Sequence, residues 1–190
     1  MSAPNRNFEI YSPEEYLGLL KASDRRFEYW NGEIVDMSSS WNHGVISTNL
    51  VAALHQKIRP GCTAFTGDLA VRPPGFHFFL FADAGVVCGP PQLENVEGID
   101  AIANPILIAE VLSPTTERRD RNEKRKAYQS LPSLREYLLI DQTAANLVRY
   151  LKTGDLWQQD GASGIDGSLV LPSIQATLLL SELYNGVLFD

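Results

Sequence analysis

The spacing of apolar residues along the chain changes repeatedly between the helical and the strand period. Ser12, Pro13 and Glu15 form a helix start, with a serine N-cap, a proline at the first position and a glutamate three residues after the cap. A second helix of about 15 residues is expected over 43–58, because apolar positions recur there every three to four residues. A Pro-Gly pair then ends it.

Segments with strand-like patterns surround the second helix. Asn31-Gly32 favours a type I′ turn, so the alternating segments on either side of it are expected to form a hairpin. The polar segment 89–105 is long for a connection and is expected to be a flexible lip beside a site. The chain ends in a pattern typical of a strand followed by a short helix. The other expected strands cover 62–66, 69–72, 78–87, 106–112, 136–141 and 147–151.

This order of elements predicts an α/β fold, with a single mixed β-sheet flanked by helices in one domain covering 1–190. The chain has 190 residues, of which 44% are hydrophobic and 21% charged, as is ordinary for a soluble globular protein. No run approaches the roughly 18 apolar residues that span a bilayer, and the N-terminal sequence does not resemble a secretory signal. We therefore expect a cytoplasmic protein that has no contact with a membrane.

Charge and cysteine content limit the chemistry further. The net charge of −7 argues against a tight, electrostatically driven nucleic-acid binder. The net charge is compatible with an enzyme that contacts nucleic acid through a local basic patch, here 118–126, and a metal ion. Cys62 and Cys88 are expected to be reduced core residues unless the fold brings them together. The absence of a cysteine–histidine cluster in the sequence argues against a zinc site.

The segment 110–128 carries the most chemical information. Glu110 interrupts the apolar run 106–112, which has the character of a strand buried on both faces. A glutamate in that position needs a partner, because desolvating its charge costs several kcal/mol or more. In the charged helix that follows, Lys124 shares a core-facing stripe with Leu131 at seven-residue spacing. The lysine is therefore expected to point inward, toward Glu110.

Asp83 is a second acid in an apolar run, FFLFADAGVVC. Two acids on adjacent strands can share one divalent cation, and oxygen ligands suit Mg²⁺ or Mn²⁺. A nearby lysine such as Lys124 can stabilise negative charge on phosphorus or orient the attacking water. Asp83, Glu110 and Lys124 together therefore fit metal-assisted phosphodiester hydrolysis. Each acid alone would more often cap a turn or pair with arginine, and Asp120 is expected to be a purely structural partner of Lys124 one helical turn away.

Over nearly its whole length the chain resembles the bacterial "putative restriction endonuclease" family of Uma type, within the PD-(D/E)XK nuclease superfamily. The most specific block is EVLSPTTERRDRNEKRKAY, and FEYWNGEIVDM, NHGVISTNL, ADAGVVCG and LPSIQATLLLSELYNGV also match. The resemblance implies a restriction-endonuclease-like core preceded by an N-terminal helix and hairpin.

The resemblance also assigns site residues. It places the superfamily aspartate on Asp83, although Ala82 precedes it where proline is usual, and the superfamily glutamate on Glu110. These two acids are the implied ligands of Mg²⁺ or Mn²⁺. Leu112 stands at the usual lysine position, and in this family the lysine comes from the following helix, here Lys124.

The same resemblance bears on a fallback lysine, an N-terminal acid and a histidine. Lys126 is the fallback for the catalytic lysine. Superfamily sites often add an acid from an N-terminal element, for which Glu28 is the first choice and Glu33 the alternative. His43 resembles the family's helix-entry histidine, and by itself it is typical of a capping or hydrogen-bonding residue.

The expected function is a Mg²⁺- or Mn²⁺-dependent endonuclease that binds DNA weakly. A homodimer is expected because a duplex cut needs two active sites, with the hairpin and 178–183 as candidate surfaces. The alternative is a catalytically silent nuclease-like fold that serves as a binding or regulatory subunit. A phosphodiesterase acting on small or damaged nucleic acids is a third hypothesis.

Overall fold

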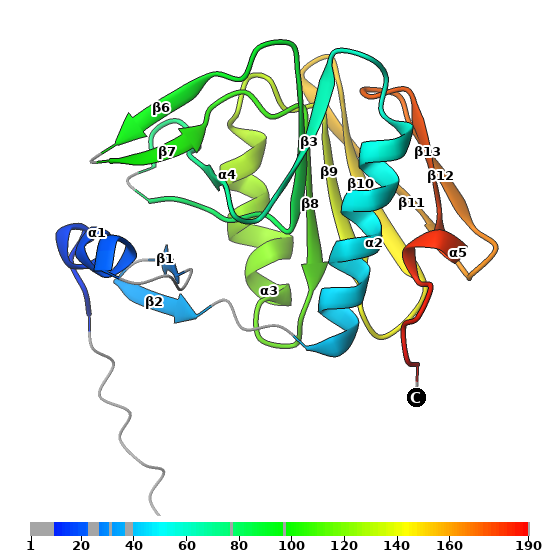
Figure 1. The fold of residues 1–190 in the computed structure, drawn as a ribbon, viewed down its shortest axis with the longest axis horizontal. Helices are drawn as coiled ribbons and strands as arrows, with labels where there is room; N and C mark the ends of the chain where they lie inside the picture. The colour runs from blue at the N-terminus through cyan, green and yellow to red at the C-terminus, as the bar shows by residue number, and fades with distance from the viewer. Residues whose placement is uncertain are drawn as a thin grey trace, which may run out of the picture.

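The fold is built around a six-stranded mixed sheet with the strand order β11-β10-β9-β8-β5-β3 (Figure 1). In this sheet β8 and β9 are parallel and the other neighbours are antiparallel. The strands are β3 (Cys62–Thr66), β5 (Ala84–Cys88), β8 (Leu107–Leu112), β9 (Glu136–Asp141), β10 (Asn146–Thr153) and β11 (Leu156–Ser163). This computed structural model describes residues 10–22, 27–30, 32–36, 40–76, 78–96 and 98–189.

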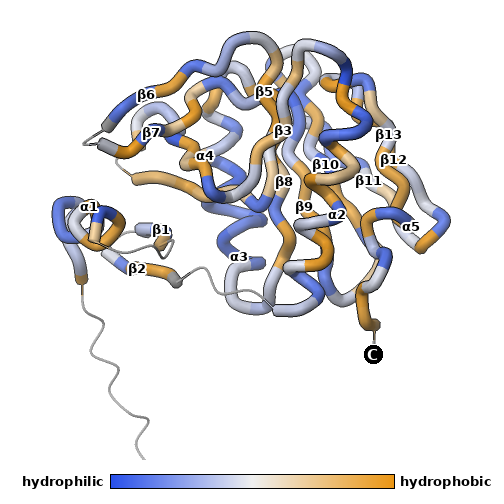
Figure 2. The backbone as a smooth tube through the Cα atoms, viewed as in Figure 1, coloured by the Kyte–Doolittle hydropathy of each residue, from blue (hydrophilic) through white to orange (hydrophobic). Residues whose placement is uncertain are grey.

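Helices lie on both faces of this sheet. Leu107, Ala109 and Val111 of β8 belong to the cluster that packs against α2, while Ile108 and Leu112 belong to the cluster that packs against α4. Figure 2 shows apolar residues along the central strands, whereas α3 is hydrophilic. The helices are α1 (Pro13–Ala22), α2 (Trp41–Lys57), α3 (Glu117–Arg119), α4 (Arg125–Gln129) and α5 (Leu180–Leu183), with a π-helical turn over Asp120–Lys124 between α3 and α4.

Three smaller sheets complete the fold. The predicted hairpin is present as an antiparallel pair, although its turn residue Asn31 lies outside the described residues. One sheet orders its strands β4-β7-β6, and the pair β12-β13 packs on the α2 side of the core. The strands are β1 (Phe27–Trp30), β2 (Glu33–Asp36), β4 (Ala70–Val71), β6 (Leu93–Val96), β7 (Ile99–Ile102), β12 (Ser168–Leu171) and β13 (Ala176–Leu179).

The first helix begins as its sequence predicts. The amide of Ser12 donates to the Glu15 carboxylate at 2.7 Å, and the amide of Glu15 donates to the Ser12 hydroxyl at 3.2 Å. This reciprocal pair is a capping box, which satisfies two amides that have no partner inside the helix. The second helix begins two residues before the predicted position, because the Ser40 hydroxyl accepts from the His43 amide and acts as its N-cap.

One loop prediction and one strand prediction were wrong. The segment 89–105 is not a loop throughout, since β6 and β7 form a hairpin within it beside β4. The run 78–87 becomes a strand of the sheet only at Ala84, and before that only Leu80 pairs, through an isolated bridge to Val71. Its apolar residues Phe79 and Phe81 are buried by side-chain packing without being part of a ladder. An apolar run indicates burial, and periodicity alone does not show which backbone conformation provides it.

The prediction of two reduced cysteines was also wrong. Cys62 and Cys88 are joined by a disulfide, with 4.0 Å between their Cα atoms. The antiparallel register of β3 and β5 pairs these two residues directly, although they are 26 positions apart in the sequence. The disulfide therefore fixes the edge strand β3 to β5 at the end of the pair that is remote from Asp83.

The C-terminal segment belongs to the core of the molecule. Leu178, Leu180 and Leu183, which lie in the segment expected to offer a dimer surface, are at most 1% exposed and pack in the α2-side cluster. These three leucines are therefore not available to a dimer surface, whereas Leu179 of the same segment is 39% exposed. Among the described residues, no helix is both long enough and apolar enough to cross a membrane.

Candidate active site

A pocket of about 360 Å³ lies where α2, the entry to β5 and the end of β8 meet the segment that leads into the π-helical turn. Its walls also include the turn after β3, and Asp120 and Lys124 of the π-helical turn itself. The residues of the pocket with ionisable side chains are His43, Asp68, Asp83, Glu110, Asp120 and Lys124. Asp83 and Glu110 thus line the same pocket, as the sequence predicts.

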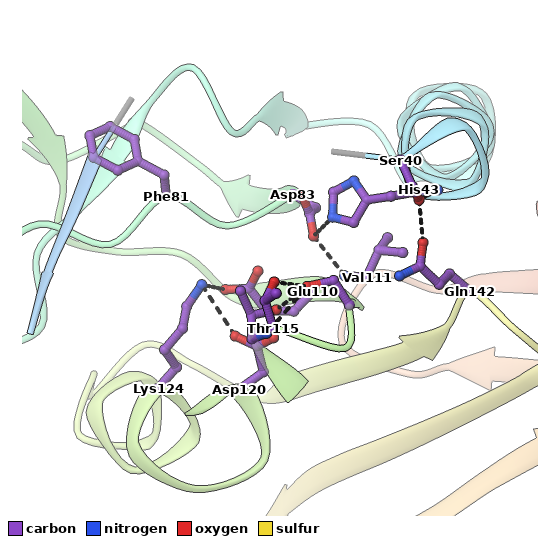
Figure 3. A network of polar contacts seen from close by, with 12 residues as sticks. Ser40, His43, Phe81, Asp83, Glu110, Val111, Thr115, Asp120, Lys124 and Gln142 are labelled. Atoms are coloured by element: carbon purple, nitrogen blue, oxygen red, sulfur yellow. Dashed lines mark hydrogen bonds and ion pairs between the residues drawn. The ribbon is translucent and has the colours of Figure 1, made fainter. Parts of the chain in front are cut away.

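Lys124 is the centre of a buried ion cluster. Its ammonium lies 2.7 Å from Oε1 of Glu110 and 3.5 Å from Oδ1 of Asp120 (Figure 3). It also lies 2.9 Å from Oε1 of Glu28. Burial alone would lower the pKa of Lys124, but the surrounding carboxylates outweigh that effect and raise it well above its usual value. The lysine is therefore charged, and its ammonium lies among three acids.

Glu110 is held by two donors on one oxygen. The Tyr128 hydroxyl donates to Oε1 at 2.9 Å, and the Lys124 ammonium contacts the same atom. Burial raises the pKa of Glu110 well above its usual value, and the nearby carboxylates add to this while Lys124 opposes it. Glu110 therefore keeps its proton to a higher pH than an exposed glutamate does.

Asp83 sits directly before β5, at the point where the chain enters the sheet. Its Oδ2 accepts a hydrogen bond from the Val111 amide at 2.6 Å and lies 3.3 Å from Nε2 of His43. Burial would lower the pKa of His43, but the hydrogen bond and the charge of Asp83 raise it. The histidine is the third residue of α2, so the cap of that helix helps to place it beside Asp83.

Asp120 was expected to be structural, and the structure places it in the pocket. It is 1% exposed, and its Oδ1 has no hydrogen-bond partner among the described residues, although Lys124 lies within ion-pair distance. Burial raises the pKa of Asp120. The sequence does hold a signal for this residue: it precedes Lys124 by four positions and therefore lies on the same helical face.

The N-terminal acids differ in position. Glu28 is 2% exposed, contacts Lys124 and accepts from the Phe81 amide at 3.1 Å. Glu33 instead forms an exposed ion pair with Arg119 at 3.3 Å. The fallback lysine, Lys126, is exposed on the outer side of the helix. The geometry thus brings Glu28 and Lys124 to the acids, while the catalytic roles of all these residues stay predictions.

The donor set of this pocket fits a hard divalent cation. Asp83 and Glu110 supply carboxylate oxygens, and the hydrogen bonds described above use only one oxygen of each. No group of three or more His, Cys, Asp or Glu side chains suited to a metal ion occurs in the part of the chain that the structure describes. Mg²⁺ commonly uses one or two carboxylates together with water and substrate phosphate, so two acids are sufficient. Oδ1 of Asp120 likewise has no hydrogen-bond partner among the described residues.

The fold is that of a known class of nuclease-like proteins. A solved structure from Anabaena variabilis ATCC 29413, described as a "putative nuclease belonging to DUF820", matches with a TM-score of 0.69. The match covers 93% of this chain and 98% of that chain at 18% sequence identity. This likeness confirms the predicted restriction-endonuclease-like fold.

Sequence comparisons identify the family. Residues 13–180 match the family model Uma2, described as "Putative restriction endonuclease". The "Uncharacterized protein slr1290" of Synechocystis sp. (strain ATCC 27184 / PCC 6803 / Kazusa) is 32% identical over 190 residues, covering 98% of each chain. The "Uncharacterized protein sll1609" of the same organism is 32% identical over 149 residues, covering 77% of this chain and 84% of that protein. The chain belongs to the Uma2 family, and the predicted resemblance is confirmed.

Proposed function

We propose that this protein is a nuclease that hydrolyses phosphodiester bonds of DNA with the help of Mg²⁺ or Mn²⁺. The observation that carries the proposal is the meeting of Asp83, Glu110 and Lys124 at one pocket. Membership of a family described as "Putative restriction endonuclease" supports a nuclease function. We take 1–190 to be one domain that carries this activity.

Each residue would have a separate task. Asp83 and Glu110 would hold the cation, which when bound polarises a phosphate oxygen and lowers the pKa of a bound water. Lys124 would stabilise the negative charge that develops on the phosphate oxygens, because a charge fixed in a dry site acts more strongly than one in water. Glu28 would keep the lysine in place through the 2.9 Å contact.

DNA binding is expected to be weak. The basic patch 118–126 is largely compensated, since Arg121 pairs with Glu117 at 2.7 Å and Arg118 with Glu123 at 3.8 Å. The whole chain carries a net charge of −7, which repels the DNA backbone. Bound cations would reduce this repulsion at the site. A homodimer and a cytoplasmic location remain part of the proposal.

The test is cleavage of supercoiled plasmid DNA by the purified protein, with Mg²⁺ or Mn²⁺ and with excess chelator. Cleavage is expected with either ion and should be lost in chelator and in Asp83→Ala. Asp160→Ala is the control, because Asp160 is an acid outside the pocket that pairs with Arg149. Cleavage that persists in chelator, or in Asp83→Ala, would refute the metal mechanism.

The alternative is a catalytically silent fold that acts as a binding or regulatory subunit. One observation favours it: Lys124 already contacts Glu110 and Glu28 at hydrogen-bond distance, so a cation has to compete for Glu110. Calorimetric titration of the wild type with Mn²⁺ separates the two functions. A folded protein that neither binds the ion nor cleaves any nucleic acid would be the silent form.

A further inference from the structure

The helix that carries Lys124 contains a π-helical turn over Asp120–Lys124. In a continuous α-helix the residue seven positions before Lys124 would lie on the same face, because two turns take 7.2 residues. That residue is Glu117, and its side chain is instead 49% exposed. A π-helical turn takes more residues than an α-helical turn, so the inward-facing position moves from residue 117 to residue 116. Thr116 accordingly lines the pocket. The π-helical turn thus keeps one more carboxylate away from a cluster already rich in acids.

Tyr137 forms a hydrogen bond with the backbone of this turn. It lies on β9 beside Ile108 of β8, is 0% exposed, and donates its hydroxyl to the carbonyl of Asp120 at 3.0 Å. A wide helical turn has poorer backbone hydrogen bonding than a regular α-helix, so a buried side-chain donor that bonds to one of its carbonyls helps to hold it. The Tyr137 hydroxyl supplies a donor at the first residue of the turn.

The same tyrosine is in contact with the rest of the site. Its ring packs against Tyr128 with 5.5 Å between centroids, and the Tyr128 hydroxyl donates to Glu110. We propose that Tyr137 is a positioning residue, whose hydroxyl fixes the π-helical turn so that Lys124 and Asp120 face Glu110. The effect on turnover rests on the proposed nuclease function, whereas the effect on the turn does not.

The test compares Tyr137→Phe with Tyr184→Phe. Tyr184 is a matched control because it is also buried and its hydroxyl also donates to backbone carbonyls, those of Asp141 and Asn146, both at 2.8 Å. It does not line the pocket. The measurements are backbone hydrogen exchange over 120–125, Mn²⁺ affinity by calorimetry, thermal unfolding and single-turnover plasmid cleavage.

Both variants are expected to unfold at a somewhat lower temperature and to bind Mn²⁺ as the wild type does. Only Tyr137→Phe should accelerate exchange over 120–125, by up to about tenfold, because it alone loses the bond to the turn. Only Tyr137→Phe should slow cleavage, by about 100-fold, since displacing a reacting group by about 1 Å has that effect. Unchanged exchange over 120–125 in Tyr137→Phe, or an equal loss of turnover in Tyr184→Phe, overturns the proposal.

Two further outcomes remain informative. If the wild type cleaves no nucleic acid, the proposed function fails while the exchange comparison still decides whether Tyr137 fixes the turn. If Tyr137→Phe does not fold, hydrogen exchange of the wild type decides whether Tyr137 fixes the turn. The amides of 120–125 should then open together with those of β9, whereas opening of the turn at a clearly lower free energy overturns the proposal.

Discussion

The Lys124 ammonium lies 2.7 Å from Oε1 of Glu110 at a place where both side chains are almost completely excluded from water. An ion pair of this kind gives little net stability, because desolvating both charges offsets their attraction. Removing one partner, however, leaves the other charge buried without compensation. The site is therefore sensitive to the loss of either residue, and this sensitivity can be measured.

Lys124→Ala should lower the rate of DNA cleavage by roughly 100- to 1000-fold, because it removes an electrostatic group aimed at the reacting phosphate. Mn²⁺ affinity should not fall, since the carboxylate ligands remain and the ammonium no longer competes for Glu110. Lys126→Ala is the matched control, as Lys126 lies on the same helix and is exposed. Single-turnover cleavage and calorimetry check both statements. A comparable loss in Lys126→Ala would show that the lysine has been misassigned.

Glu110→Gln should weaken Mn²⁺ binding by at least about tenfold, because an amide oxygen replaces a charged ligand. Glu136→Gln is a suitable control, since Glu136 is an equally buried glutamate on the neighbouring strand β9 and pairs with Arg149. The control should lose stability and keep its Mn²⁺ affinity. Calorimetric titration of both folded variants measures this, and equal affinities in the two would remove Glu110 from the set of ligands.

Gly85→Ala should destabilise the fold by about 1–3 kcal/mol, which is typical of overpacking in a core. A Cβ atom at Gly85 would lie only 2.1 Å from Cζ of the buried Phe65 ring on β3. Adding Phe65→Leu should restore part of the loss. Gly18→Ala is the control, since a Cβ there would meet no heavy atom within 4 Å apart from its chain neighbours and the backbone of its own helix, and alanine favours the helix α1. Urea unfolding should show loss of stability in the first variant and a gain in the control.

Reduction of the Cys62–Cys88 disulfide should lower the free energy of unfolding by about 3.5 kcal/mol, the chain-entropy value for a loop of this size. Urea unfolding of the wild type with and without a dithiol reductant measures this difference. The double variant Cys62→Ser with Cys88→Ser should match the reduced protein and should not respond to the reductant. Two free thiols in the protein purified without reductant would show that the bond does not form.

Local sequence determined those features that depend on residues a few positions apart. The capping box of Ser12 and Glu15 formed as predicted, because its atoms belong to one helical turn. The inward direction of Lys124 followed from its spacing to Leu131, which reports the helical period. The buried position of Glu110 followed from the apolar residues around it, and all of β8 is buried.

Only the tertiary structure decided which distant residues meet. Nothing in the local pattern distinguished Glu28 from Glu33, and the choice came from how the hairpin packs beside Phe81. The Cys62–Cys88 pair likewise required the register of β3 and β5, which long-range strand pairing sets. The hydrogen bond from the Tyr137 hydroxyl to the carbonyl of Asp120 likewise joins residues of two separate elements. The periodicity of apolar residues indicates on which face of its own helix or strand a side chain lies. Contacts between elements are fixed by packing and strand register across the whole chain.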